Sequence, residues 1–171
     1  GSDGQVLLWT IGTIEPKVID KVNSRILSLA VNKNTIAVGM EDGIVKIYNT
    51  NNSQKDLITS TGNKPIYSIA FSKDGKQIAI GNSLGQITIY DADKFIVSGN
   101  LIGHISSVND MVFSNNDNRL ISCSSDKTIR IWDLDNKNNN PVIIDRHDSW
   151  VYGLELINKG NNLVSVGADK T

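Results

Sequence analysis

The residue types of a hydrolase occur twice in this sequence with one spacing. A histidine is followed after 18 residues by a serine and after 22 by an aspartate, in His104, Ser122 and Asp126 and in His147, Ser165 and Asp169. Such a set can form a catalytic triad, in which the histidine activates the serine. A nucleophilic serine, however, sits on a strained, exposed turn beside an oxyanion hole, whereas Ser122 lies inside the apolar run 120–123. The sequence therefore predicts no catalytic residue here.

Other motifs for catalysis or metal binding are absent from the sequence. There is no Gly-rich phosphate loop ending in Lys-Ser or Lys-Thr and no His-Glu-x-x-His motif. The two histidines are 43 residues apart and make a poor metal site. The single cysteine, Cys123, excludes an internal disulfide and is expected to be a small core residue. We therefore expect no cofactor, no metal and no enzymatic activity.

Composition limits the class of protein. The chain has 171 residues, of which 39% are hydrophobic, enough for a folded core. Its 17 basic and 18 acidic residues give a net charge of −1, which offers no electrostatic attraction for nucleic acid or an anionic membrane. The apolar runs are short, and the first residues lack the features of a signal peptide. We expect a soluble, cytoplasmic protein without nucleic-acid or membrane partners.

A repeat with a period of about 42 residues runs through the chain. A turn, alternating apolar residues and an aromatic residue recur at 3–9, 42–48, 84–90 and 126–132. A second apolar unit starts at Ile36, Ile78, Leu120 and Leu163. A third starts at Ser28, Ser68, Asp110 and Gly153. Three landmarks that keep one period make chance similarity a poor explanation.

The repeated units have the chemistry of β-strands. Each is short, rich in Ile and Val, and apolar at every second residue, while Gly, Asn, Asp and Ser gather between the units. Four short strands fit into each period; in one period we place them at 66–71, 77–82, 85–91 and 95–101. We expect an all-β protein with essentially no long helix.

These residues resemble the WD-repeat family of β-propellers. The fullest match begins with Gly103-His104, continues through Phe113-Ser114 and ends with the segment from Ser125 to Trp132-Asp133. The resemblance implies four-stranded antiparallel blades around a central channel, about four blades' worth in this chain. It divides the chain into strands three and four of one blade at 3–20, full blades at about 25–60, 66–101 and 107–145, and strands one and two of a further blade at 149–167.

The resemblance also implies a structural role for the His-Ser-Asp sets. His104, Ser122, Asp126 and Trp132 would form the hydrogen-bonded tetrad typical of such a blade. His147, Ser165 and Asp169 would form a partial tetrad, and Trp9 is the residue that could complete it. The two earlier blades have Val38 and Ile80 at the serine position and Tyr48 and Tyr90 at the tryptophan position. We expect apolar packing to replace the network there.

The two ends of the chain carry complementary halves of a blade, and an open array exposes apolar faces and strand edges. The chain could close on itself as a four-bladed ring, pair with a second copy, or be part of a larger propeller. Because closure with so few blades would be strained, we hypothesise a homodimer that forms a two-chain, eight-bladed ring.

A protein or peptide partner is expected on one rim of the propeller. By resemblance, the rim positions are those three and five residues after the His104 position and the one before the turn aspartate: Arg25, Leu27, Glu41, Tyr67, Ser107, Asn109, Ser125, Trp150 and Tyr152. Exposed aromatics with an arginine are typical of interfaces, although Trp150 and Tyr152 could instead cover the core between blades. The sequence thus favours a protein-interaction scaffold; the alternatives are a recognition segment of a larger signalling protein or an assembly unit without its own ligand.

Overall fold

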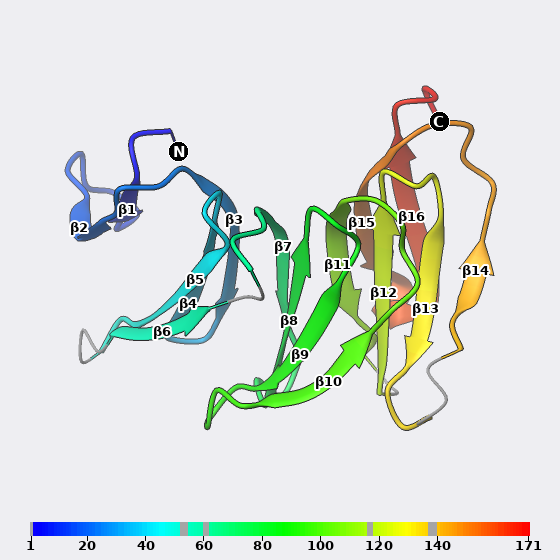
Figure 1. Ribbon diagram of the computed structural model, residues 1–171. Coiled ribbons are helices and arrows are strands. Elements are labelled where there is room, and N and C mark those ends of the chain that lie inside the picture. The colour runs from blue at the N-terminus through cyan, green and yellow to red at the C-terminus, as the bar shows by residue number, and fades with distance from the viewer. Residues whose placement is uncertain (1, 52–54, 60–61, 116–117, 137–139) are drawn as a thin grey trace.

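The computed structural model describes the chain except for residues 1, 52–54, 60–61, 116–117 and 137–139 (Figure 1). The described residues form five antiparallel sheets. Half-blade N contains β1 (Gln5–Leu8) and β2 (Lys17–Lys21), and half-blade C contains β15 (Val151–Ile157) and β16 (Asn162–Gly167). Between them lie three four-stranded blades, so the all-β prediction is confirmed.

Each full blade is a meander in which every strand pairs with the next one in the sequence. Blade 1 contains β3 (Ile26–Asn32), β4 (Thr35–Met40), β5 (Ile44–Asn49) and β6 (Lys55–Thr59). Blade 2 contains β7 (Ile66–Phe71), β8 (Gln77–Asn82), β9 (Ile87–Asp91) and β10 (Val97–Leu101). Blade 3 contains β11 (Val108–Phe113), β12 (Arg119–Ser124), β13 (Ile129–Asp133) and β14 (Val142–Ile144).

The structure differs from the predicted elements in small ways. A single turn of 3₁₀ helix, Asn158–Gly160, joins β15 to β16. Strand β9 begins at Ile87 rather than at residue 85, because Gly85 has a positive φ of 83° and belongs to the preceding turn. No helix within the described residues is long and apolar enough to cross a membrane.

The core lies between successive sheets rather than within any one of them. Ala37 and Ile47 of blade 1 pack with Ile69 and Ile78 of blade 2, and similar apolar clusters join blade 2 to blade 3 and blade 3 to half-blade C. Each sheet therefore depends on its neighbours to bury its apolar faces, as expected for a repeat architecture.

Hydrogen bonds between the first strands of neighbouring blades add to this packing. Ser28 Oγ donates to the carbonyl oxygen of Ile66, and Ser68 Oγ donates to that of Val108, both over 3.0 Å. The facing residue across the sheet is Gly39 or Gly81, where a Cβ would collide with the serine and with the next blade. Glycine is thus needed at these two positions because a neighbouring blade approaches closely.

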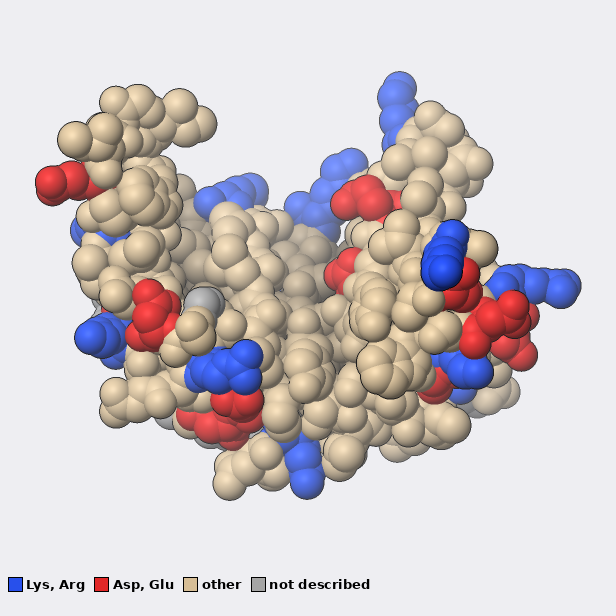
Figure 2. Space-filling model, turned by 90° about the horizontal axis from the view of Figure 1, so that it is seen from above, with Lys and Arg blue, Asp and Glu red and all other residues tan. Residues whose placement is uncertain are grey.

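The array of sheets is open. Figure 1 shows half-blade N and half-blade C at opposite ends of the array, with the three full blades between them. Figure 2 shows the same arrangement from above as two arms separated by a wide space. In a single chain, therefore, the two half-blades do not meet and a four-bladed ring is not formed.

Candidate functional site

The four residues predicted for the tetrad lie together in blade 3. Trp132 Nε1 donates to Ser122 Oγ over 2.8 Å, and Ser122 Oγ lies 2.8 Å from His104 Nε2. His104 Nδ1 lies 2.7 Å from Asp126 Oδ2. The indole N–H can only donate, so the serine hydroxyl accepts that bond and donates its own hydrogen bond to the imidazole, which in turn donates to the carboxylate. The network ties the connection after β10 to the interior of blade 3.

Asp126 is the charged end of this network. Burial alone would raise the pKa of its carboxyl, but hydrogen bonds from His104 and Thr128 hold that pKa well below its usual value. The adjacent Lys127 adopts a positive φ of 74°, at the turn position that Gly43 and Gly85 occupy in blades 1 and 2. The bonds to Asp126 thus stabilise a turn whose backbone is unfavourable for lysine.

The second set has the same geometry without its tryptophan. His147 Nδ1 lies 2.8 Å from Asp169 Oδ2, and His147 Nε2 lies 2.9 Å from Ser165 Oγ. Trp9 belongs to the opposite end of the array and is exposed, so the structure does not bring it to Ser165 within one chain. The set in half-blade C therefore holds three of the four groups.

Blade 1 contradicts the expectation that apolar packing alone replaces the network. Tyr48 is buried, and its hydroxyl donates to Asp20 Oδ2 of half-blade N over 3.0 Å. Lys46 Nζ lies 3.2 Å from the same oxygen. Burial and the neighbouring Asp20 carboxylate raise the pKa of Tyr48 above its ordinary value. The sequence pattern missed this network because Asp20 belongs to the preceding sheet and to no repeated motif.

Neither Ser122 nor Cys123 is placed for nucleophilic chemistry. Both side chains are fully buried, and the Ser122 hydroxyl is already held between an indole and an imidazole. Burial and the nearby Asp110 carboxylate raise the pKa of the Cys123 thiol to about 12, which keeps it protonated. Among the residues that the structure describes, no group of His, Cys, Asp and Glu side chains is arranged to hold a metal ion.

A β-bulge recurs near the start of the first strand in blades 1, 2 and 3 and in half-blade C. The pairing with the second strand shifts by one residue at the same place each time. A bulged residue leaves the ladder, and its side chain is aimed differently from those of its neighbours. The four bulged residues all belong to the predicted rim: Leu27, Tyr67, Asn109 and Tyr152.

The three aromatic residues predicted for the rim are exposed in this array. Tyr67, Trp150 and Tyr152 are 41%, 52% and 52% exposed, although large aromatic side chains are usually mostly buried. Trp150 and Tyr152 contact each other edge to face, with ring centres 6.3 Å apart and planes at 86°. Both rings are therefore exposed in the open array, where half-blade C lies at one end.

The polar rim residues are engaged with one another. In blade 3, Asn109 Nδ2 donates to Ser125 Oγ over 3.0 Å and to the carbonyl oxygen of Val151 over 2.7 Å, while Ser107 Oγ donates to a carbonyl of blade 2. In blade 1, Arg25 forms an exposed ion pair of 3.1 Å with Glu41. The side chains of these polar residues already have hydrogen-bond or ion-pair partners within the chain. The rings of Tyr67, Trp150 and Tyr152 are exposed.

The charged side chains on the face seen in Figure 2 do not form a patch of one sign. Figure 2 shows Lys and Arg side chains interspersed with Asp and Glu, separated by large areas that carry neither. With the net charge of −1, this distribution gives the face no strong charge of either sign.

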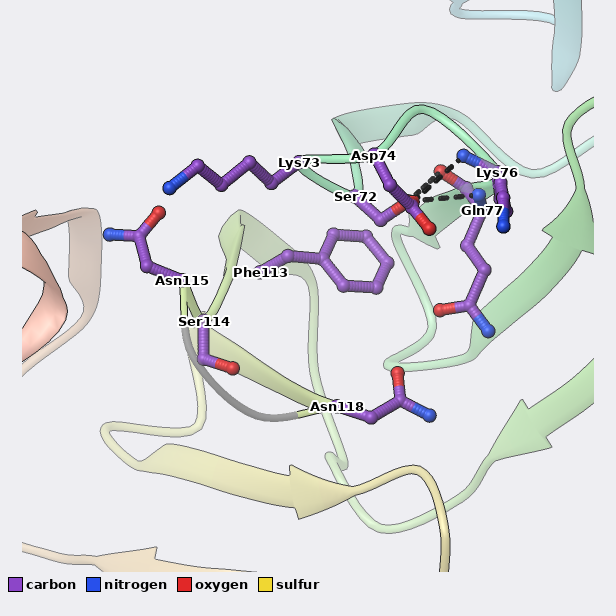
Figure 3. Close-up of a pocket in the computed structure, with 9 residues that line it drawn as sticks. All are labelled: Ser72, Lys73, Asp74, Lys76, Gln77, Phe113, Ser114, Asn115 and Asn118. Carbon is purple, nitrogen blue, oxygen red and sulfur yellow. Dashed lines mark hydrogen bonds between the residues drawn. The ribbon is translucent and has the colours of Figure 1, made fainter.

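A cavity of about 590 Å³ lies at the other ends of the strands, between blades 2 and 3 (Figure 3). The turn at Ser72–Gln77 faces Phe113, Ser114, Asn115 and Asn118 across it. The Ser72 hydroxyl bonds to Asp74 within its own turn over 2.7 Å, whereas at the preceding interface Asn32 reaches across to the Ser72 carbonyl over 3.1 Å. No motif in the sequence marks this cavity, because turn length and side-chain direction decide whether it closes.

Comparisons with known proteins agree with this architecture. The family model for the WD domain, G-beta repeat, matches residues 94–133, and the model for the Vps8 beta-propeller matches residues 17–110, more than half of the chain. The chain resembles the crystal structure of RRP9 WD40 repeats with a TM-score of 0.74 and 23% identity, over 81% of this chain and 44% of that one.

Two relatives show the same relation in sequence. WD repeat and SOCS box-containing protein 1 of Mus musculus is 36% identical over 101 residues, which cover 58% of this chain and 24% of that protein. WD repeat-containing protein SL1-17 of Schistosoma mansoni is 28% identical over 135 residues, 77% of this chain and 44% of that protein. The chain thus spans less than half the length of these relatives. Its repeats, sheets and matches place it in the WD-repeat β-propeller family.

Proposed function

We propose that the chain is a non-enzymatic scaffold that binds a protein or peptide partner on the rim formed by the bulged ends of its first strands. The observation that carries this proposal is that Tyr67 and Tyr152 leave their strand ladders at a bulge that recurs at the same place in each sheet, and that both rings are exposed. Large aromatic side chains contribute strongly to binding when a partner covers them.

We further propose that the blades work within a closed ring in the cytoplasm, as a segment of a larger propeller or together with a second copy. Support comes from the RRP9 WD40 structure, of which this chain covers 44%. A closed ring would bury the apolar end faces of the array. The same rim would serve a recognition segment of a larger signalling protein.

Site-specific crosslinking tests the rim. A photoreactive phenylalanine replaces Tyr67 or Tyr152 in the purified protein, and a matched control places it at Val142, an exposed position on the outer strand β14. We expect both rim positions to crosslink one partner that the control position does not. Equal crosslinking at all three positions would count against a rim site.

The partner identified in this way is then titrated against the unlabelled protein. Tyr67→Ala and Tyr152→Ala should each weaken binding by about tenfold or more, the loss typical of an interface aromatic. Their melting temperatures should stay near that of the unsubstituted protein, because both side chains are exposed. Unchanged affinity in both variants would refute the rim.

A further inference from the structure

Two connections between blades 2 and 3 carry exposed aliphatic side chains. Leu84, in the turn between β8 and β9, is 54% exposed, and Ile102 and Ile105, in the connection between β10 and β11, are 81% and 86% exposed. We call these three residues the aliphatic patch. Blades 2 and 3 are both complete and share one apolar cluster, so neither connection belongs to an end of the array.

The turn and the connection lie against each other. Ser107 Oγ donates to the carbonyl oxygen of Ser83 over 3.2 Å. A Cβ at Gly85 would collide with the carbonyl oxygens of the residues before and after Ile105. Because Leu84 lies between Ser83 and Gly85 in the chain, these contacts bring Leu84 and Ile105 to neighbouring places on the surface.

Leu84 occupies the turn-aspartate position of the repeat. In blade 1, Asp42 Oδ1 accepts a hydrogen bond from the backbone N–H of Ile44 over 3.1 Å and thereby holds the turn. In blade 2, Asn82 takes over this part, since its Oδ1 accepts bonds from the backbone N–H groups of Leu84 and Gln86 over 2.9 and 3.2 Å. The turn is thus held without the side chain at position 84, and the fold does not account for a leucine there.

Ile102 and Ile105 differ from their counterparts in the same direction. The connection into half-blade C has exposed aspartates, Asp145 and Asp148, at these two positions. The backbone is alike in both connections: the N–H of Ile105 donates to the tetrad residue Asp126 over 3.1 Å, and that of Asp148 donates to the corresponding aspartate over 2.9 Å. Single exposed aliphatic residues are common, but three of them, at positions that are acidic in other repeats, indicate a contact surface.

Two basic residues border the aliphatic patch. The Arg130 guanidinium lies against Gly103, the residue after Ile102, and Lys127 is exposed next to Asp126. The Asp126 carboxylate itself is 2% exposed and is bonded within the tetrad. The segments 82–86 and 102–107 contain no acidic residue. A partner with acidic side chains around an apolar one would therefore be complementary to this surface.

We propose that the aliphatic patch binds a peptide segment of a protein partner that carries aliphatic or aromatic side chains next to acidic ones. The apolar side chains would cover the patch and remove it from water, and the acidic ones would approach Lys127 and Arg130. This inference rests on the proposed scaffold function. It names the chemistry of the partner and adds a contact site between blades 2 and 3 to the rim.

Selection from a library of random peptides displayed on phage tests this chemistry, with the purified protein as the target. Enriched peptides should carry Leu, Ile, Val or Phe close to Asp or Glu. One enriched peptide is then synthesised with a fluorescent label and titrated by anisotropy. Changing its acidic residues to the amides should weaken binding by about two- to fivefold, and by less at high salt. No enrichment, or enriched peptides without this pattern, would overturn the proposal.

Substitutions that copy other repeats locate the binding site. Leu84→Asp introduces the residue type of Asp42, and Ile105→Asp introduces that of Asp148, so both variants should keep the melting temperature of the unsubstituted protein. Each should weaken peptide binding by about tenfold or more, because it removes an apolar contact and repels the acidic peptide. The matched control is Ile96→Asp: Ile96 is 56% exposed in the connection between β9 and β10, at the other end of blade 2, and its substitution should leave the affinity unchanged. Equal affinity in all three variants would overturn the proposal.

The aliphatic patch and the aromatic rim can fail separately. A partner that crosslinks at Tyr67 and Tyr152 and binds Leu84→Asp with unchanged affinity would refute the patch and leave the scaffold function standing. Selected peptides that require Leu84 and Ile105, in a protein that captures no partner at either rim tyrosine, would support the patch and refute the aromatic rim.

Discussion

Blades 3 and 1 bury an aromatic side chain at the same place and satisfy its polar tip in different ways. Trp132 and Tyr48 are each 1% exposed. In blade 3 the indole begins a chain of hydrogen bonds through Ser122 and His104 to Asp126. In blade 1 the phenol bonds directly to Asp20, whose charge is balanced by Lys46.

The difference shows which features of the repeat are exchangeable. Both aromatics need an acceptor, because a buried donor without one is destabilising by about 1–3 kcal/mol. Both acceptor systems also reach back to the chain before the blade, His104 after β10 and Asp20 in β2. In blades 1 and 3 a buried aromatic is thus tied to the preceding segment by polar groups, and two different sets of residues supply the tie.

Replacing Ser122 of blade 3 by valine, the residue type that blade 1 has at this position, should have the largest effect on stability. Ser122→Val copies Val38 and leaves the indole N–H and the imidazole without their shared partner. We expect a loss of about 2–4 kcal/mol in the free energy of unfolding, measured by urea denaturation. The reciprocal Val38→Ser in blade 1 is the comparison, since it adds a buried hydroxyl without the His104 network. A loss under about 1 kcal/mol for Ser122→Val would show that packing alone holds blade 3.

Acid should weaken blade 3 through Asp126. Its pKa is lowered in the folded protein from an ordinary value of 3.8, so its contribution to stability is complete above about pH 5 and declines as the pH falls through and below 3.8. The urea midpoint should therefore drop between pH 6 and pH 3. In Asp126→Asn the drop should be smaller, although the variant is less stable at pH 6. Equal drops in both proteins would assign the acid sensitivity to other carboxylates.

Removing the phenol tip in blade 1 should have a smaller effect. Tyr48→Phe keeps the ring and leaves Asp20 paired with Lys46, so we expect a loss of about 1 kcal/mol. Tyr67→Phe removes the same group from an exposed ring and should change stability by less than about 0.5 kcal/mol. Thermal unfolding of both variants measures the difference, and equal losses would contradict a structural role for the Asp20 bond.

The turn of blade 3 offers the smallest and only stabilising change. Lys127→Gly places glycine at a positive φ, as at Gly43 in blade 1, and should raise stability by up to about 1 kcal/mol. Lys73→Gly, in a turn without positive φ at that residue, should be neutral or slightly destabilising. Calorimetric melting compares the two, and a destabilised Lys127→Gly would indicate that the lysine side chain itself contributes.

Much of the fold followed from local patterns. The period of about 42 residues and the alternation of apolar residues predicted short strands, four to each period, the resemblance to the WD-repeat family implied antiparallel blades, and the structure confirms that fold. These features are readable because strand alternation and turn chemistry depend on residues close in sequence. The binding role of the rim residues stays a prediction.

Side-chain contacts between neighbouring sheets were the hardest feature to predict from the sequence. The sequence did not indicate that Asp20 would accept a bond from Tyr48, or that Asn109 would reach the Val151 carbonyl. Each of these two hydrogen bonds joins residues from different sheets. The residues at the equivalent positions of the other blades have different chemistry. No repeated motif marks either pair, in contrast to the bonds that Ser28 and Ser68 donate to the next blade from equivalent positions.

The sequence by itself determined the positions of the short strands, the turns between them and the residue types of the His-Ser-Asp-Trp set, all of which are encoded within one period. The tertiary structure alone decided that Tyr67 and Tyr152 leave their strand ladders at bulges, that a cavity stays open beside Ser72, and that half-blade N, which carries Trp9, lies at the opposite end of the array from β16. The physical reason is distance along the chain: backbone propensity acts over a few residues, whereas the angle between successive sheets results from side chains packing across a whole interface.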